Sequence, residues 1–502
     1  MTTQRTRPAR PTRRALALTA LLIVALVVLV AGPVSSAAAA NKAWTIMLYL
    51  DADNSLEQYG PTDFVNELCN PGSTSNVNVV VLFDRIPKLD KTYGDWTSTK
   101  LFYCTAGLTP TPENAIADWG ERNMGDPQTM IDFVSYCKTN YPADHYVIGW
   151  WDHGYCWWPN GWILSDDTSV DTLDLDEQAA GFDAVGGVDL IVSDQCQMQL
   201  LEDASFWQPY AKAVVASEEY VMWDGIDYGA LTTTLQNNPD ISIDALAADT
   251  VQHTQGDGLT YSAVALDSRF DALVTAVDEW ALALRNGLPA YRSAYVTARG
   301  NTLVFDDPDE MDLYDAAFQI KAAVNDATID AKCDAVMAAV NNVVLSNWIS
   351  GSKYANAHGI AIWWPDDSAG LLYRTPYAPE FDCWAYYRTV VPSSLSTAWD
   401  SFLGAFALQD YVAPTTTDNN DGLPHQAFTL VLTPTDAASG VFYTEYRIDG
   451  GDWQTGTSAV MRIRIKHKRP GYSRGYHLVE YRSIDNAGNV EATKSCTVRL
   501  GV

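Results

Sequence analysis

Apolar residues in the first half of the chain gather in short runs that end in polar turns. Four of these runs are apolar at nearly every position, which is typical of strands buried on both faces of a sheet. Amphipathic segments such as residues 127–137 lie between them, so the pattern predicts an α/β fold with a mostly parallel sheet covered by helices. Functional residues of such sheets gather at the carboxyl ends of the strands. The predicted strands are residues 44–50, 77–83, 145–150 and 188–192.

The periodicity changes toward the C-terminus. Residues 413–422 are rich in Thr, Asn and Asp and disfavour helix, which predicts a linker or an exposed turn. Beyond them, residues 426–501 alternate apolar and polar positions between turn signals, which predicts a small all-β sandwich. Residues 483–491 resemble the last strands of bacterial immunoglobulin-like repeats. The predicted strands are residues 428–432, 441–448, 461–465 and 478–484.

The first forty residues have the order of a signal peptide. Five arginines precede an uncharged apolar run at residues 15–31, and small residues follow up to Ala40. We expect cleavage before Asn41 and a secreted protein; an uncleaved run would tether it outside the membrane. The predicted parts are therefore a signal peptide (1–40), an α/β domain (41–412) and an immunoglobulin-like sandwich (413–502).

The charge balance is strongly acidic. The whole chain has a formal net charge of −30, and loss of the five leader arginines leaves 27 basic and 62 acidic residues, or −35. Such a charge excludes nucleic acid as an expected partner. It favours solubility, and it can also attract divalent cations or cationic substrates over long range.

Basic residues stand out in the predicted sandwich. Several alternate along one predicted strand and would line one of its faces. They could hold an anionic surface or matrix ligand or the acidic α/β domain, or they could simply guard a solvated edge strand against aggregation. The residues are Arg462, Arg464, Lys466, Lys468, Arg469 and Arg474.

Two predicted strands end on reactive side chains. His153 follows one, and Cys196 follows another after 42 intervening residues, which leaves room for a crossover connection. Neighbouring parallel strands would bring the imidazole and the thiol to the same sheet edge. A cysteine at the start of a helix, beside a histidine, favours the nucleophilic thiolate. Taken singly, Cys196 could be a buried inert thiol and His153 a hydrogen-bonded core residue.

The eight cysteines show no Cys-x-x-Cys pair and no zinc-ligand spacing, which argues against a structural zinc site. Export would permit disulfides among the seven cysteines other than Cys196, and the sequence does not give their pairing.

The motifs Asp152-His153-Gly154 and Asp194-Gln195-Cys196 resemble the histidine and cysteine motifs of the clostripain family of cysteine peptidases. Further blocks agree in order over residues 42–410, among them the opening strand with Asp53-Asn54 and the segment 216–228. The resemblance implies a caspase-like fold and an endopeptidase in which Cys196 attacks the peptide carbonyl and His153 transfers the proton. It implies an oxyanion site at the backbone N–H groups of Gly154 and Cys196, and it needs no third triad member.

The resemblance also implies specificity for Arg or Lys before the scissile bond. Asp194 would lie at the floor of the substrate pocket, and Asp224 matches a second pocket acid. Asp194 and Cys196 are two residues apart in an extended segment, so their side chains would point the same way. The alternative for Asp194 is a cap on a helix that begins near Cys196.

The chain departs from the family pattern in two places. Gln195 replaces the family's usual alanine, which should be tolerable if the side chain points away from the cleft. The interval between His153 and Cys196 contains no Lys or Arg, so self-cleavage after a basic residue is not expected there, and the protein would be active uncut or be processed elsewhere.

No cofactor is expected for the chemistry itself, and the family resemblance allows a calcium requirement. The metal site stays unassigned, because the acidic run that could supply ligands is equally consistent with a solvated loop. That run contains Asp306, Asp307, Asp309, Glu310 and Asp312.

The expected function is a secreted cysteine endopeptidase acting on proteins or peptides with basic residues. One alternative is a catalytically inactive, exported peptidase-like protein that binds a cell-surface or matrix ligand through its sandwich. Another is a thiol hydrolase of the same fold that acts on a non-peptide amide and has no need of Asp194 or Asp224.

Overall fold

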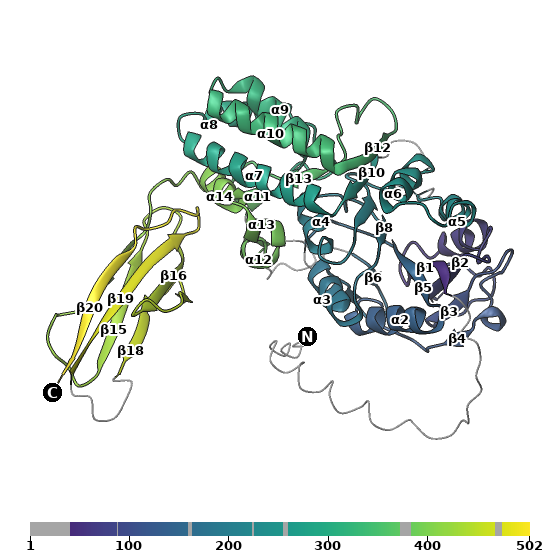
Figure 1. Cartoon of the computed structure of the whole chain (residues 1–502), viewed down its shortest axis with the longest axis horizontal. Coiled ribbons are helices and arrows are strands. Elements are labelled where there is room, and N and C mark those ends of the chain that lie inside the picture. The colour runs from purple at the N-terminus through teal and green to yellow at the C-terminus, as the bar shows by residue number, and fades with distance from the viewer. Residues whose placement is uncertain are drawn as a thin grey trace, which may run out of the picture. The chain divides into compact units, whose positions relative to one another are not determined.

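The centre of the computed structural model is a nine-stranded sheet in the order β12-β10-β9-β8-β5-β1-β2-β3-β4 (Figure 1). The structure describes residues 41–87, 89–158, 163–222, 225–254, 260–371, 383–466 and 474–501. The predicted signal peptide (1–40) lies outside these residues. The strands of the sheet are β1 (Lys42–Ala52), β2 (Val77–Arg85), β3 (Lys100–Tyr103), β4 (Ala117–Asp118), β5 (Ala143–Trp151), β8 (Leu190–Asp194), β9 (Ala213–Ala216), β10 (Thr260–Ala265) and β12 (Val344–Ile349).

The middle of the sheet is parallel. β1 pairs in parallel with β2 and β5, β5 with β8, and β8 with β9, whereas the outer strands pair antiparallel. All four strands predicted from the apolar runs are present in this parallel core. Register places Trp151 of β5 beside Asp194 of β8, so both strands end at the same edge.

Alternate residues of the central strands enter two different cores. Met47 and Ile148 belong to one apolar cluster, while Ile46 and Val147 belong to the other. Because both faces are buried, these strands are apolar at nearly every position. Helices α2, α3, α4 and α7 supply residues to the first core, and α5 and α6 to the second (Figure 1). The mostly parallel α/β sheet with helices on both faces is therefore confirmed.

The helices of this region are α1 (Gly60–Asp63), the π-helix η2 (Phe64–Leu68), the 3-10 helix η3 (Pro112–Asn114), α2 (Pro127–Asn140), α3 (Leu175–Val185), α4 (Leu201–Trp207), α5 (Tyr228–Asn237), α6 (Ile243–Gln252), α7 (Ser268–Gly287), α8 (Arg292–Asn301), α9 (Leu313–Ala323), α10 (Ala327–Val343), α11 (Ser368–Leu371), α12 (Cys383–Val390), α13 (Pro392–Ser396) and α14 (Trp399–Leu408). Two short two-stranded sheets complete it, β6 (Ser165–Asp166) with β7 (Asp171–Thr172) and β11 (Glu310–Asp312) with β13 (Ala361–Trp363).

Two antiparallel sheets form the C-terminal part. Their strands are β14 (Thr415–Asp418), β15 (Phe428–Thr435) and β18 (Met461–Ile465) in one sheet, and β17 (Gln454–Thr455), β16 (Val441–Ile448), β19 (Arg474–Asp485) and β20 (Lys494–Gly501) in the other. Leu430 and Val479, from different sheets, share one apolar cluster, as in a sandwich. The prediction that residues 413–422 are a linker is wrong in part, because Thr415–Asp418 pairs with β15 as an edge strand.

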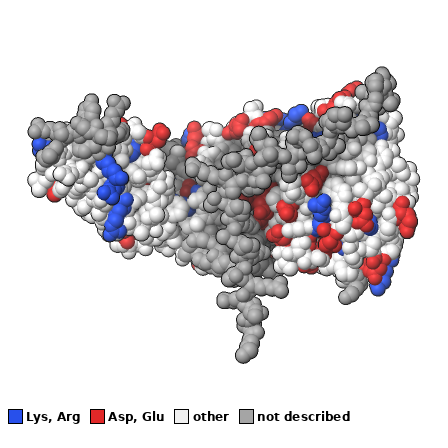
Figure 2. Space-filling view, turned by 90° about the horizontal axis from the view of Figure 1, so that it is seen from below, with Lys and Arg blue, Asp and Glu red and all other residues white. Residues whose placement is uncertain are grey.

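The row of basic residues lies partly outside the described residues. Arg462 and Arg464 alternate with buried Ile463 and are exposed, as the pattern predicts. Lys468 and Arg469 are among the residues that the structure does not describe. Figure 2 shows basic side chains gathered at the left of the view, over the sandwich, whereas the charged side chains visible at the right are mostly acidic. An immunoglobulin-like fold and the boundary at residue 413 stay predictions, since residues Lys42–Val502 form one compact unit.

Two further features bear on export. Among the described residues, every helix is too short or too polar to cross a bilayer. All eight cysteines are free thiols in this structure, and Cys69 and Cys104 are close enough for their thiols to interact.

Candidate active site

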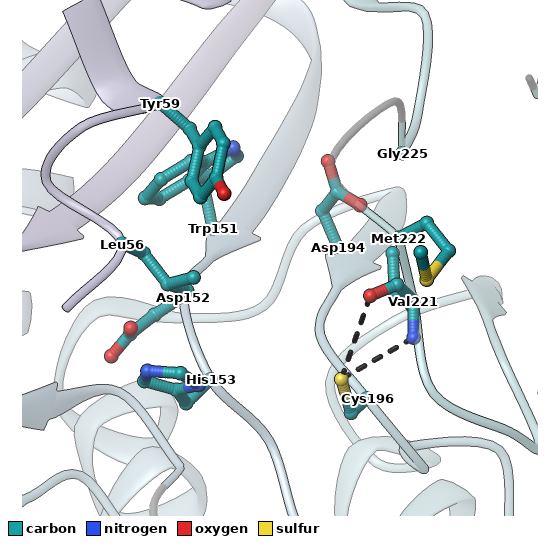
Figure 3. Close-up of a pocket in the computed structure, with 10 residues that line it drawn as sticks. All are labelled: Leu56, Tyr59, Trp151, Asp152, His153, Asp194, Cys196, Val221, Met222 and Gly225. Atoms are coloured by element: carbon teal, nitrogen blue, oxygen red, sulfur yellow. Dashed lines mark hydrogen bonds between the residues drawn. The ribbon is translucent and has the colours of Figure 1, made fainter. Parts of the chain in front are cut away.

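A pocket opens at the edge where the central strands end, and both predicted reactive side chains line it. Figure 3 shows the imidazole of His153 and the thiol of Cys196 on opposite sides of this pocket, with Asp194 farther along the wall that carries Cys196. The structure therefore brings together three of the residues singled out from the sequence. The lining residues are Leu56, Tyr59, Trp151, Asp152, His153, Asp194, Cys196, Val221, Met222 and Gly225.

His153 lies just beyond the end of β5. Its Nε2 is 3.0 Å from the Oγ of Ser55, which follows β1, the parallel neighbour of β5. Burial lowers the pKa of His153 below its ordinary value of 6.5, so the imidazole is neutral at pH 7. Ser55 was not singled out from the sequence; the only available signal was its place at the end of a strand beside the histidine strand.

Asp152, which precedes His153, connects the histidine turn to two other segments by hydrogen bonds. The Asp152 carboxylate is buried and accepts hydrogen bonds from Asn54 Nδ2 (2.7 Å) and from the backbone N–H of Ser165. Burial raises the pKa of Asp152 well above its ordinary value. Asn54 also donates to the carbonyl of Ser165 at 2.9 Å. These bonds join the segments that follow β1 and β5 to the start of β6.

Cys196 lies in the turn after β8, and its environment differs from the predicted one. Helix α4 begins at Leu201, five residues later, so Cys196 is not at a helix start and the dipole argument is wrong. The Val221 N–H donates to its Sγ at 3.3 Å. Burial is the largest influence on the thiol and raises its pKa to about 11. The thiol is therefore protonated at neutral pH in this structure, and its burial acts against the thiolate that the sequence led us to expect.

The histidine and cysteine turns touch each other. A Cβ on Gly154 would lie 2.6 Å from the carbonyl oxygen of Cys196 and 2.7 Å from the Cβ of Gln195, so only glycine fits. Gln195 is fully buried, and its Nε2 donates to the His153 carbonyl at 2.8 Å while its Oε1 accepts from Ser193 Oγ at 2.9 Å. The Gln195 side chain does not line the pocket, which is the condition under which its replacement of alanine was expected to be tolerated. It also links the two turns, a role that the sequence alone did not show.

The predicted oxyanion donors are close together in this arrangement. Gly154 and the Cys196 carbonyl are in contact, and neither the Gly154 nor the Cys196 amide donates to an acceptor within the described residues. The oxyanion role of these two amides stays a prediction.

Two acids line the pocket, and Asp194 is the one predicted to set specificity. Its Oδ1 accepts from the Tyr261 hydroxyl at 2.9 Å and its Oδ2 from the Ile226 N–H at 3.3 Å, so it does not cap a helix near Cys196 and that alternative is wrong. Burial raises the pKa of Asp194 to about 6, and the two hydrogen bonds act in the opposite direction. Asp224, the second predicted pocket acid, lies outside the described residues; Gly225, which follows it in sequence, lines the pocket.

The acidic run that was considered for calcium is used in other contacts. Asp309 pairs with Arg299 at 2.5 Å, Glu310 accepts from Gln197 Nε2 at 3.0 Å, and Asp312 caps helix α9 through the Asp315 N–H. Within the described ranges, two other carboxylate groups converge closely enough to hold a metal ion. They are Asp53, Asp84, Glu121 and Asp166, and Asp410, Asp436 and Asp485.

Comparison with known proteins gives one family and several related folds. The model of the clostripain family matches residues 48–406. Clostripain from Hathewaya histolytica is 30% identical over 218 residues, which are 38% of this chain and 41% of that protein, so the matched part spans about two fifths of that relative's length.

Two solved structures share the fold at low identity. A secreted C11 cysteine protease from Bacteroides thetaiotaomicron, in complex with an irreversible peptide inhibitor, has a TM-score of 0.52 at 18% identity over 71% of this chain and 99% of its own. An inactive zymogen C11 protease from Parabacteroides distasonis has a TM-score of 0.51 at 15% identity over 72% and 98%.

Proposed function

The chain belongs to the clostripain family of cysteine peptidases, and from that premise we propose that it is an endopeptidase that cleaves after Arg or Lys with Cys196 as nucleophile. The observation that carries this proposal is the composition of one pocket. A thiol, a neutral imidazole and a half-buried carboxylate line the same pocket and come from the ends of neighbouring parallel strands.

The protonation states define the first step. Cys196 begins as a thiol and His153 as a neutral base, so the proton passes from Sγ to the imidazole as Sγ attacks the substrate carbonyl. Because Ser55 engages Nε2, we assign the proton exchange to Nδ1. The imidazolium then donates this proton to the leaving amine, which breaks the C–N bond and leaves an acyl-enzyme.

Hydrolysis of the acyl-enzyme repeats the exchange with water. His153 takes a proton from water, the hydroxide oxygen adds to the thioester carbonyl, and the proton returns to Sγ as the thiolate leaves. The oxyanion of both tetrahedral intermediates would lie on the amides of Gly154 and Cys196. Preorganised donors of this kind usually supply a large share of the rate.

Asp194 suits a long cationic side chain. Its carboxylate lies in the pocket with Trp151 and Met222, whose apolar surfaces can cover the methylene stem of Lys or Arg. At neutral pH the carboxylate is mostly ionised, because its pKa is about 6. The same geometry disfavours the non-peptide hydrolase, which has no need for an acid here.

Activation and location follow the sequence-based expectations. Since no Lys or Arg lies between His153 and Cys196, we propose that the protein is active uncut or is processed elsewhere. We also propose export by the leader at 1–40 and a role for the sandwich in binding a surface or matrix ligand. An inactive binding protein is the less favoured alternative, because both reactive side chains are intact and line one pocket.

Cleavage of fluorogenic peptides that end in Arg, Lys or a neutral residue tests the proposal. Wild type should cleave the basic peptides, Cys196→Ala should lose this activity, and Asp194→Asn should lose the preference for basic over neutral peptides. Absence of cleavage with and without calcium would support the binding-protein alternative, and a neutral preference in wild type would refute the role of Asp194.

A further inference from the structure

Glu310 is a buried acid that contacts both the histidine turn and the cysteine turn. It is the first residue of β11, and its side chain is fully buried. Its Oε2 accepts from Gln197 Nε2 at 3.0 Å, and Gln197 directly follows Cys196. The Cys156 thiol, three residues after His153, is close enough to the same carboxyl for a hydrogen bond. One side chain therefore joins the segments that follow the proposed nucleophile and the proposed base.

The two residues that meet Glu310 both have a left-handed backbone conformation. The φ angle is +44° at Cys156 and +57° at Gln197, a region that residues other than glycine, Asn and Asp rarely occupy. Such a conformation persists only where the surrounding structure holds it. Gln197 is fully buried, and its N–H donates to the Glu219 carbonyl at 3.1 Å while its side chain donates to Glu310. The contacts of Glu310 are therefore made at a strained position in each turn.

The surroundings of Glu310 favour the neutral form of its carboxyl group. Burial raises its pKa well above the ordinary value of 4.5, and the nearby Asp307 acts in the same direction. The Cys156 thiol is fully buried as well, and burial raises its pKa well above the ordinary value of 9.0. Glu310 therefore meets the two turns as a hydrogen-bonding group and not as a charge.

The rest of the acidic run holds Glu310 in place. Asp307 accepts from the Tyr155 hydroxyl at 3.2 Å, which adds a second contact with the histidine side. Asp309 forms an ion pair with helix α8 at 2.5 Å. Glu310 itself pairs with Trp363 of β13 in the small two-stranded sheet. The carboxyl is therefore carried by a fixed segment of backbone, against which two flexible turns can be held.

We propose that Glu310 is a positioning residue for the peptidase reaction and holds the cysteine turn and the histidine turn in a fixed relation. This inference rests on the proposed function, in which Cys196 and His153 must exchange a proton. Glu310 is not among the residues that line the pocket, so it acts through Gln197 and Cys156. Loss of its carboxyl should slow the chemical step and leave binding of the substrate nearly unchanged.

The test measures peptide cleavage and the unfolding temperature for the full chain and matched variants. Glu310→Ala should lower kcat for an Arg peptide by about tenfold to a hundredfold, with KM within about twofold. Glu310→Gln keeps the size of the side chain and an acceptor for Gln197, so it should retain most of kcat. Glu491→Ala is the control, because Glu491 is a buried acid of the sandwich that accepts from the N–H groups of Thr416 (2.8 Å) and Ser483 (3.2 Å). It should destabilise the protein and leave kcat unchanged.

A double variant tests whether Glu310 acts through Gln197. Gln197→Ala should also lower kcat, and its combination with Glu310→Ala should lower kcat by less than the product of the two separate effects, because both remove the same contact.

Hydrogen exchange gives a measurement that does not depend on cleavage. Amides in residues 153–158 and 195–199 should exchange faster in Glu310→Ala than in wild type, because both turns lose a buried contact. The same amides should exchange at the wild-type rate in Glu491→Ala.

Three results would overturn the inference. Full kcat in Glu310→Ala, with wild type active, would refute the positioning role and leave the proposed function intact. Equal losses of kcat in Glu310→Ala and Glu491→Ala would show general destabilisation. Unchanged exchange in both turns of Glu310→Ala would show that the carboxyl does not hold them, whether or not the protein cleaves peptides. Absence of cleavage by wild type would refute the proposed function and the kinetic part of this inference, and faster exchange in both turns would then support the link itself.

Discussion

The side chain of Gln195 donates a hydrogen bond of 2.8 Å to the backbone carbonyl of His153. This bond joins the residue before the proposed nucleophile to the proposed base, across two turns that are separated by 42 residues in sequence. The family pattern usually has alanine at this position, which cannot make the bond. The Gln195 side chain therefore ties the histidine turn to the cysteine turn.

Gln195→Ala should lower kcat by about tenfold, because loss of a buried hydrogen bond costs about 1–2 kcal/mol and loosens the placement of His153. The KM for an Arg peptide should change little, since Gln195 does not line the pocket. Gln208→Ala removes a bond between Gln208 and Asp271 at the surface and serves as the control. Full kcat in Gln195→Ala would show that the bond does not position the base.

Sequence reasoning located the reactive residues because they follow strands that are easy to identify. Apolar runs at β5 and β8 predicted where His153 and Cys196 would emerge, and the parallel register places both strand ends at one edge. The environment of the thiol was not predictable in this way. Its raised pKa arises first from burial and then from nearby acids such as Asp194 and Glu219, which depend on how distant segments pack around the turn.

Contacts between distant side chains were also beyond the sequence. Ser55 meets His153, and Tyr261 meets Asp194, only because the sheet order places their strands nearby. Neither Ser55 nor Tyr261 belongs to a sequence motif whose spacing indicates a catalytic or binding role. The same holds for the carboxylates that converge from four separate segments, those of Asp53, Asp84, Glu121 and Asp166.

Ser55→Ala should lower kcat by about two- to tenfold, because a typical hydrogen bond contributes about 0.5–1.5 kcal/mol and Ser55 orients the ring through Nε2. Binding of substrate should be nearly unaffected, so KM should stay constant. Ser55→Thr keeps the hydroxyl and should restore most of the rate. A threonine variant as slow as the alanine variant would argue against a role for the hydroxyl.

The pH dependence of kcat/KM should report the ionisation of Asp194. Its pKa is about 6, so the carboxylate is ionised above this pH and attracts a basic side chain, and it becomes neutral as the pH falls through 6. The kcat/KM for an Arg peptide should therefore fall between pH 7 and pH 5, mainly through KM. Asp194→Asn should lack this step. An identical step in Asp194→Asn would assign it to another group, such as His153.

Alkylation of Cys196 by iodoacetamide should be slow at pH 7 in the free protein. Burial raises its pKa to about 11, and only the thiolate reacts, so the rate should rise about tenfold per pH unit from pH 7 to pH 10. A free thiol with a pKa near 8.5 should level off by about pH 9.5. Mass spectrometry of the peptide that contains Cys196 measures its alkylation, and the Cys196→Ala variant serves as the blank. A rate already constant at pH 7 would indicate a preformed thiolate–imidazolium pair.

Gly154→Ala should reduce kcat by about a hundredfold or more. The added methyl carbon would lie 2.6 Å from the Cys196 carbonyl oxygen, and this contact with backbone cannot be relieved by rotation of a side chain. The two turns must therefore separate, which moves both proposed oxyanion amides, and loss of one such donor costs about 10²–10³ in kcat.

Gly300→Ala is the matched control for this substitution, because a Cβ there meets nothing within 4 Å and lies in helix α8. It should keep full activity and leave the free energy of unfolding unchanged or higher by up to about 1 kcal/mol. Measurement of kcat together with the unfolding temperature separates displacement of the amides from general destabilisation. Normal kcat in a folded Gly154→Ala protein would rule out the assignment of the oxyanion site to the contact between these two turns.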